Sequence, residues 1–291
     1  MSRVVLGDIA LNVEVAGSGR PLLLLHGFTG SAAAWVQVSP TLSRRARTIA
    51  VDLIGHGASD CPGESARYSM DRCVADLVAL LDHLGVECAD VLGYSMGGRV
   101  ALQLAAAAPQ RVAALVVESA SPGLRSEGER RERVAADNDL AIFVEREGIE
   151  AFVDRWERLP LFHSQQSMPP AARAGLRAQR LANNPTGLAN SLRGMGAGQQ
   201  GPLWERLTTL SVPTLMIVGE SDVKYREIAS SMAALMPAAR LEMVAGAGHT
   251  VHFEQPQAFT RLVLDFLGPE ERPRHLSGDA GSPASATRSR G

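Results

Sequence analysis

The stretch DVLGYSMGGRVALQLAAA, residues 90–107, decides the fold of this chain, because it joins a strand-like run to a helix-like run through a single serine. A tight strand-to-helix turn needs small residues on both sides of its centre, and Gly93 and Gly97 supply them. The turn raises the Ser95 side chain above the sheet and directs the backbone N–H groups of the next helix toward developing negative charge. The stretch therefore predicts a reactive serine at residue 95.

The rest of the chain alternates between short apolar runs and helical stretches. Continuous apolar runs are typical of parallel strands buried on both faces, and they occur at residues 22–25, 48–51, 91–92, 114–117, 214–218 and 241–244. Apolar spacing predicts helices at residues 70–84, 96–107 and 256–267. Residues 3–16 alternate around Gly7-Asp8, which predicts an antiparallel hairpin at the sheet edge. We therefore expect an α/β fold with a mostly parallel, eight-stranded sheet and helices on both faces.

The alternation stops at residues 123–201, where amphipathic pieces are separated by prolines and by the glycine-rich GMGAG. We expect a helical lid over this range, inserted into a core formed by residues 1–122 and 202–268. Ten arginines and ten acidic residues lie between Arg125 and Arg180, which also fits a solvated, self-paired helical surface. Residues 269–291 are rich in Pro, Gly, Ser and Arg and are expected to be disordered.

Composition excludes several classes of protein. Of the 291 residues, 45% are hydrophobic and 21% charged, as in a globular protein with a large core. The net charge of −2 gives no general attraction to nucleic acid or anionic lipid. The three cysteines lack the spacing of a disulfide framework or a metal site, and no motif requires a cofactor. No leader-like or membrane-spanning run is visible, so we expect a cytoplasmic monomer or small homo-oligomer.

A serine at its free pKa is a weak base and a weak nucleophile, so a histidine must take its proton and a carboxylate must orient that histidine. His249 lies in a glycine-rich loop after the last predicted strand, where it can reach Ser95. Asp222 follows the strand at 214–218, as the chain order serine, acid, histidine requires. We expect these three to form a triad. Weaker candidates for the acid are Glu118 and Glu220, and structural roles are expected for His26, His56, His252 and Asp52.

Two backbone N–H groups are expected to face the negative charge that develops beside Ser95. Met96 supplies one because it follows the serine, and Phe28 supplies the other from the loop after the strand at 22–25. Arg99 lies four residues after Ser95, so both side chains share a helix face one turn apart. A guanidinium there suits a carboxylate substrate, although an arginine at this position would also fit a helix surface.

Five motifs occur in the order and spacing of a large enzyme family: LLHGF, DLIGHGASD, GYSMGG, GESD and GAGH. With them the chain resembles the α/β hydrolases over roughly residues 3–267. That fold carries esterases, dehalogenases, C–C bond hydrolases, lyases and receptors without activity, so the residues of the site must identify the reaction.

Further motifs extend the resemblance through the lid: GYSMGGR, ESASPGL, ERRER, DRWERLPLF and AQRLANN. With these the chain resembles the 2-succinyl-6-hydroxy-2,4-cyclohexadiene-1-carboxylate (SHCHC) synthases of menaquinone biosynthesis. The resemblance implies the triad named above and a substrate pocket formed by Tyr94, Arg99, Arg133, Trp156, Phe162 and Arg180. Arg130 or Arg131 would replace Arg133 if the alignment shifted by one helical turn.

The resemblance implies a lyase that needs no cofactor and acts on a small polycarboxylate. The serine and histidine would remove a proton from 2-succinyl-5-enolpyruvyl-6-hydroxy-3-cyclohexene-1-carboxylate, and pyruvate would leave in a 2,5-elimination that consumes no water. Whether Ser95 acts as a base or as a covalent nucleophile stays open, because both roles need the same triad. Two alternatives remain: a serine hydrolase of carboxylate-bearing esters or of C–C bonds in ring-cleavage products, and a ligand-binding protein without activity.

Overall fold

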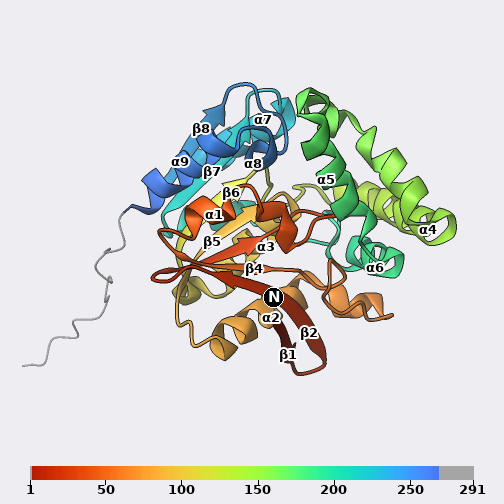
Figure 1. The fold of residues 1–291 in the computed structure, drawn as a ribbon, viewed down its shortest axis with the longest axis horizontal. Coiled ribbons are helices and arrows are strands. Elements are labelled where there is room, and N and C mark those ends of the chain that lie inside the picture. Colours follow the sequence, from red (N-terminus) through yellow and green to blue (C-terminus); the bar gives the residue numbers. More distant parts are fainter. Residues whose placement is uncertain (1, 269–291) are drawn as a thin grey trace, which may run out of the picture.

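The computed structural model describes residues 2–268, which form one eight-stranded sheet with surrounding helices (Figure 1). The strands are Ser2–Leu6 (β1), Ile9–Ala16 (β2), Pro21–Leu25 (β3), Arg47–Val51 (β4), Ala89–Tyr94 (β5), Val112–Glu118 (β6), Thr214–Gly219 (β7) and Ala239–Val244 (β8). They lie in the order β1-β2-β4-β3-β5-β6-β7-β8. All pairs from β4 to β8 are parallel, whereas β1 pairs antiparallel with β2 and β2 with β4. The predicted sheet and its edge hairpin are confirmed.

Burial differs between the centre and the edge of the sheet. All residues of β5 and β7 are buried, as their continuous apolar sequences predict. The same expectation was wrong for β8, which is only partly buried and leaves Met243 59% exposed. The reason is its position, because an edge strand has a neighbouring strand on one side only.

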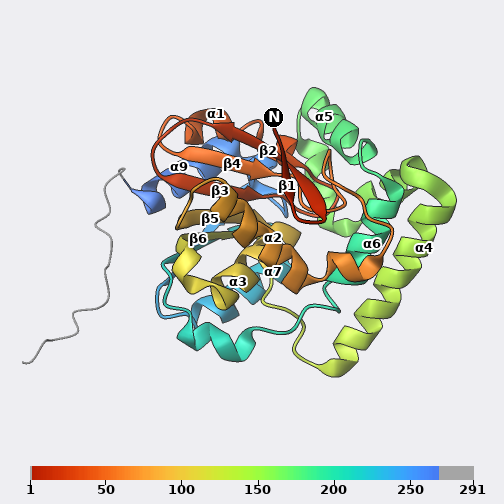
Figure 2. The ribbon, with the colours of Figure 1, turned by 90° about the horizontal axis from the view of Figure 1, so that it is seen from below.

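Helices cover both faces of the sheet (Figure 2). One face carries α2 (Met70–His83), α3 (Met96–Ala107) and α7 (Val223–Ala233), and the other carries α1 (Ser39–Leu42), α8 (Val251–Glu254) and α9 (Pro256–Leu267). Short 3₁₀ helices occur at Ala32–Trp35 (η1), Ser65–Tyr68 (η2), Pro109–Arg111 (η3) and Trp204–Thr209 (η5). Within residues 2–268, none of the helices combines the length and the apolar character that a bilayer crossing requires.

A helical insertion between β6 and β7 forms a separate layer beside the sheet (Figures 1 and 2). It contains α4 (Glu127–Glu157), η4 (Pro160–Ser167), α5 (Pro170–Leu181) and α6 (Pro185–Met195). Each of the last three elements begins with a proline, whose fixed φ angle suits a first helical position. Gly148, with φ at 81°, joins two helical pieces within α4. The tail at 269–291, which was expected to be disordered, lies outside the described residues.

Candidate active site

Ser95 lies in a strained turn between β5 and α3. Its backbone adopts φ 50° and ψ −106°, which costs energy for a residue other than glycine and has to be imposed by the surroundings. The flanking glycines make the turn possible. A Cβ on Gly93 would overlap the carbonyl group of Gly97, and a Cβ on Gly97 would overlap the carbonyl group of Leu25. The turn therefore holds Ser95 at the carboxyl end of β5, in the middle of the sheet.

We expect Gly97→Ala to lower the free energy of unfolding by about 1–3 kcal/mol, because the added methyl group has to displace the backbone of β3. Urea unfolding followed by circular dichroism measures this change. Gly175→Ala is the matched control, since a Cβ there meets nothing within 4 Å and α5 gains from the alanine. A Gly97→Ala protein as stable as the wild type would contradict the close packing of this turn.

The structure brings Ser95, His249 and Asp222 together from three distant parts of the chain. His249 Nε2 lies 3.1 Å from Ser95 Oγ, and His249 Nδ1 lies 2.7 Å from Asp222 Oδ2. Asp222 follows β7 and His249 follows β8, so all three residues lie at the carboxyl edge of the sheet. With Nδ1–H donating to the carboxylate, Nε2 is free to accept the hydroxyl proton of Ser95.

The other acid candidates lie elsewhere. The Glu118 carboxylate pairs with His252, and Glu220 lies 3.4 Å from the backbone nitrogen of Gly246. Among residues 2–268, neither forms a hydrogen bond with His249. The geometry therefore agrees with Asp222 as the partner of the histidine.

The loop after β3 passes directly beside the Ser95 turn. A Cβ on Gly27 would lie 3.5 Å from Ser95 Cβ, which places the backbone of Phe28 next to the serine. Met96 is the first residue of α3, so its N–H group has no carbonyl partner within the helix. Both expected oxyanion-hole donors therefore come from backbone adjacent to Ser95.

His26 and Asp52 hold this loop in place. His26 Nδ1 donates to the carbonyl oxygen of Gly27 at 2.8 Å, and Nε2 accepts from the backbone N–H of Leu53 at 3.0 Å. Burial lowers the pKa of His26, which keeps the ring neutral. Asp52 accepts hydrogen bonds from the backbone N–H groups of Ala32 and Ala58. These contacts agree with the structural roles expected for both residues.

Tyr94 packs between two histidine rings. Its ring centroid lies 5.4 Å from that of His249 and 4.8 Å from that of His252. Burial raises the pKa of Tyr94 and the nearby Glu118 raises it further, so the phenol is neutral at physiological pH. The ring of Tyr94 therefore forms an uncharged wall beside the triad.

Arg99 extends from α3 to the far end of the insertion. Its Nη1 donates to the Met195 carbonyl at 2.9 Å and to Gln200 Oε1 at 3.0 Å. Its Nε and Nη2 have no acceptor among the described residues. These two N–H groups form one side of the guanidinium, the side that binds a carboxylate with two parallel bonds. Desolvation lowers the pKa of Arg99 to about 10, which leaves it charged at neutral pH.

Arg133 is a near neighbour of Arg99. It lies on α4, where its Nε donates to Asp137 Oδ1 at 2.8 Å, and its charge contributes to the lowered pKa of Arg99. Arg130 instead donates to backbone carbonyls before α4, and Arg131 pairs with a glutamate one turn away. Of the three arginines that the sequence left open, Arg133 is therefore the one placed near Arg99.

Arg180 is buried in α5 and already has an acidic partner. Its Nη1 donates to Glu157 Oε1 at 2.8 Å and its Nη2 to Gln165 Oε1 at 3.0 Å. Its Nε is buried without an acceptor, and the guanidinium lies 5.1 Å from the centre of the Phe162 ring. Glu157 and Gln165 thus use two of the five N–H bonds of Arg180, and the Nε–H is among those left for a carboxylate ligand.

Aromatic side chains from the insertion lie beside the triad. The ring centroid of Trp156 lies 5.3 Å from that of Phe28 and 5.5 Å from that of Phe162, which in turn lies 6.2 Å from that of His249. The cavity that Phe28 and Phe162 bound, together with Tyr94 and Arg180, has a volume of about 30 Å³. That volume holds water but no organic ligand of several carbon atoms. None of the three triad residues lines this cavity, and Ser95 itself keeps partial exposure.

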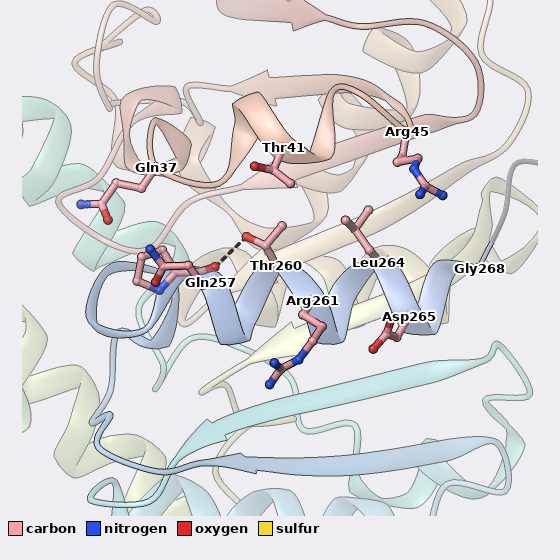
Figure 3. Close-up of a pocket in the computed structure, with 10 residues that line it drawn as sticks. Gln37, Thr41, Arg45, Gln257, Thr260, Arg261, Leu264, Asp265 and Gly268 are labelled. Atoms are coloured by element: carbon pink, nitrogen blue, oxygen red, sulfur yellow. Dashed lines mark hydrogen bonds between the residues drawn. The ribbon is translucent and has the colours of Figure 1, made fainter.

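A second cavity, of about 820 Å³, lies between α1 and α9 (Figure 3). Its lining includes Gln37, Thr41 and Arg45 beside or on α1 and Thr260, Arg261 and Asp265 on α9. None of the predicted site residues faces it, and its lining contains no serine, cysteine or histidine. Volume alone therefore does not locate the candidate active site.

Two glutamines at the site escaped the sequence analysis. Gln165 accepts from Arg180 and donates to Thr250 Oγ1 at 3.0 Å, next to His249 in the chain. Gln200 accepts from Arg99 and is fully buried. Each glutamine contacts residues more than ten positions away, so no local sequence pattern identifies it. The one sequence feature that could have pointed to Gln165 is its closeness to the DRWERLPLF motif.

The chain is similar to known proteins over most of its length. The family model described as the alpha/beta hydrolase fold matches residues 20–256. The chain is 46% identical to a Bacillus subtilis (strain 168) protein provisionally named SHCHC synthase, over 87% of this chain and 92% of that protein. It is 32% identical to the SHCHC synthase of Salmonella agona, over 84% of this chain and 93% of that protein. The chain belongs to the SHCHC synthase family of α/β hydrolases.

Solved structures agree on the fold. MenH from S. aureus matches with a TM-score of 0.84 and 35% identity, over 88% of this chain and 97% of that one. A thermophilic esterase from Thermogutta terrifontis, with malate bound, matches with a TM-score of 0.82 and 29% identity, over 92% and 98%. Because proteins named for different chemistry share this fold, the side chains at the site carry the functional argument.

Proposed function

We propose that this chain is an SHCHC synthase that eliminates pyruvate from 2-succinyl-5-enolpyruvyl-6-hydroxy-3-cyclohexene-1-carboxylate in menaquinone biosynthesis. The observation that carries the proposal is the hydrogen-bonded triad Ser95–His249–Asp222 together with Arg99, which lies one helical turn after Ser95. The Nε and Nη2 groups of Arg99 are available to an acid group. Membership of the synthase family supports the same reaction.

The triad performs the elimination by moving one proton at a time. Ser95 gives its hydroxyl proton to His249 Nε2, and Asp222 stabilises the imidazolium through Nδ1–H. The Ser95 oxygen then takes a proton from a ring carbon of the substrate. The released electron pair moves through the ring and breaks the C–O bond to the enolpyruvyl group. His249 returns its proton to the departing group, which becomes pyruvate, and no water is consumed.

Positive charge and backbone dipoles stabilise the negative charge of this reaction. Arg99 and Arg133 lie close together and bind the carboxylates of the substrate, while Tyr94, Trp156 and Phe162 enclose its ring. The N–H groups of Met96 and Phe28 face the charge that develops near Ser95. Arg180 adds a further donor beside Phe162 through its unpaired Nε.

Pyruvate release from freshly made substrate, coupled to lactate dehydrogenase, tests the proposal. The substrate decomposes by itself, so a reaction without enzyme is the control. We expect release far above that control and no oxygen from labelled water in the ring product. Release no faster than the control would refute the proposal.

A hydrolase is the second candidate, because two backbone donors beside an activated serine are also what acyl transfer requires. Hydrolysis of carboxylate-bearing esters or ring-cleavage products would place one oxygen atom from labelled water in the product. The same labelling experiment therefore separates the two reactions. Ligand binding without turnover of any substrate, unchanged in Ser95→Ala, would instead indicate a binding protein.

We expect Arg99→Ala to lower kcat/KM by about 10- to 150-fold, which corresponds to about 1.5–3 kcal/mol for a hydrogen-bonded charge pair. Arg99→Lys should recover only part of the loss, because an ammonium group cannot make the two parallel bonds. Pyruvate release over a range of substrate concentrations measures both variants. Arg45→Ala, an exposed arginine at the other cavity, is the control. A kcat/KM of Arg99→Ala equal to that of the wild type would show that Arg99 does not bind the substrate.

A further inference from the structure

The side chain of Glu118 is tied to the segment that carries His249. Glu118 ends β6, and both Glu118 and His252 are fully buried. Glu118 Oε1 accepts from the backbone N–H of His252 at 3.0 Å, and His252 Nδ1 lies 2.8 Å from Oε2 and 2.9 Å from Oε1. His252 is three residues beyond His249 and belongs to α8. The carboxylate therefore anchors the carboxyl side of the catalytic histidine's loop.

The main chain of Glu118 holds the other half of the triad. The backbone N–H of Ser95 donates to the Glu118 carbonyl oxygen at 2.9 Å. Ser95 is the residue with φ at 50°, so its conformation depends on such external contacts. One residue thus connects the backbone of the serine to the backbone beyond the histidine.

We propose that Glu118 is a positioning residue that sets the distance between Ser95 Oγ and His249 Nε2 by holding both loops at once. The proposal rests on the proposed function, in which these two atoms exchange a proton at 3.1 Å. A displacement of about 1 Å in such a pair can cost about 100-fold in rate. A carboxylate suits this role because, when buried, it demands several donors and forms stronger hydrogen bonds than a neutral acceptor.

Ring packing gives Glu118 a second route to His249. The His252 ring lies between Trp35 and Tyr94, with centroid distances of 4.8 Å to each. Tyr94 in turn contacts His249 at 5.4 Å. Loss of the Glu118 carboxylate would leave the Nδ1 and backbone N–H donors of His252 unpaired in this packed group and would release its ring orientation.

The test compares Glu118→Ala, Glu118→Gln and His252→Phe, each checked for folding by circular dichroism. Glutamine keeps both hydrogen bonds from residue 118 to His252 but removes the charge. Its carbonyl oxygen accepts from the backbone N–H of His252, and its NH₂ group donates to Nδ1 when the His252 proton is on Nε2. Phenylalanine preserves the packing of residue 252 and removes only the Nδ1 donor. Leu81→Ala is the control for lost stability, since Leu81 is fully buried in α2, outside the triad loops.

Two readouts are used: kcat and KM for pyruvate release, and the rate at which a fluorophosphonate probe labels Ser95. We expect Glu118→Ala to lower kcat and the labelling rate at least about tenfold with KM changed less than about threefold, because the loops and not the substrate contacts have moved. Glu118→Gln should recover both rates to within about threefold of wild type, and folded His252→Phe should lose at least about threefold.

Wild-type labelling by folded Glu118→Ala would overturn the proposal, as would an equal loss in Leu81→Ala or no recovery in Glu118→Gln. If Glu118→Ala does not fold, wild-type labelling by His252→Phe overturns it instead. Failure of the proposed function is distinguishable, because labelling requires only an aligned triad. A wild-type protein that labels but releases no pyruvate refutes the synthase reaction and leaves the positioning role to be judged on labelling alone.

Discussion

The Ser95→Ala variant is expected to release pyruvate at least about 1,000-fold more slowly than the wild type, with KM nearly unchanged. Ser95 Oγ is the only side-chain atom of the described residues that hydrogen-bonds to His249 Nε2, so its removal leaves the histidine without the group it activates. Losses of about 10³- to 10⁶-fold are typical when a triad serine is removed, because the serine and histidine act as a unit. Single-turnover measurement of pyruvate release gives the chemical step directly.

The control for Ser95→Ala is ligand binding, which should persist because the arginines and aromatic walls are intact. A rate within tenfold of wild type would show that another group removes the proton. Mass spectrometry of the wild type during turnover addresses the role of Ser95 itself. We expect no acyl group on Ser95 with the native substrate, because the serine acts as a base. An accumulating acyl-enzyme would assign it as a covalent nucleophile.

The Asp222→Asn variant is expected to lose about 10³- to 10⁴-fold in kcat while remaining folded. In the variant, the asparagine NH₂ group can take the place of Asp222 Oδ2 and donate a hydrogen bond to His249 Nδ1. The imidazole then adopts the tautomer in which Nδ1 is unprotonated and Nε2, which faces Ser95, carries the proton. The ring can no longer accept the serine proton, and no carboxylate stabilises the imidazolium. Steady-state pyruvate release measures the loss, and thermal unfolding checks that the fold is kept.

Glu220→Gln is the matched control for Asp222→Asn. Glu220 lies two residues earlier, and within residues 2–268 its carboxylate hydrogen-bonds only to the backbone of Gly246, so its neutralisation should change kcat by less than about threefold. A larger loss of kcat in Glu220→Gln than in Asp222→Asn would indicate that Glu220, and not Asp222, is the acid that orients His249. Equal small losses would indicate that His249 needs no carboxylate to work.

Several residues of the candidate site can be predicted from short stretches of sequence, because the geometry of a single turn, strand end or helix determines where they lie. The glycines around Ser95 are required by overlaps with backbone carbonyls nearby, and a five-residue pattern contains that information. Asp222 and His249 could be predicted as candidates because they follow strands in a parallel sheet, whose carboxyl ends meet at one edge. Arg99 could be predicted as a candidate because residues four apart share a helix face.

Other parts of the site depend on distant contacts. Arg133 differs from Arg130 and Arg131 only in the direction it takes from α4, and the packing of α4 on the end of α6 determines that direction. Arg180 was expected to bind substrate, and the structure adds a partner, Glu157, that occupies one of its N–H groups. The Arg180–Glu157 pair joins α5 to α4, so helical periodicity alone does not predict it.

The sequence by itself determined the fold class, the edge hairpin, the helical interruption and the three residues of the candidate triad, because hydrophobic periodicity and glycine-flanked turns are local properties. Only the tertiary structure decided which arginine lies near Arg99 and that Glu118 pairs with His252 across 134 positions of sequence. The physical reason is that a buried charge must find its partner in space. Which residue becomes that partner depends on how helices and strands pack together, so the sequence around either residue carries no pattern that identifies the pair.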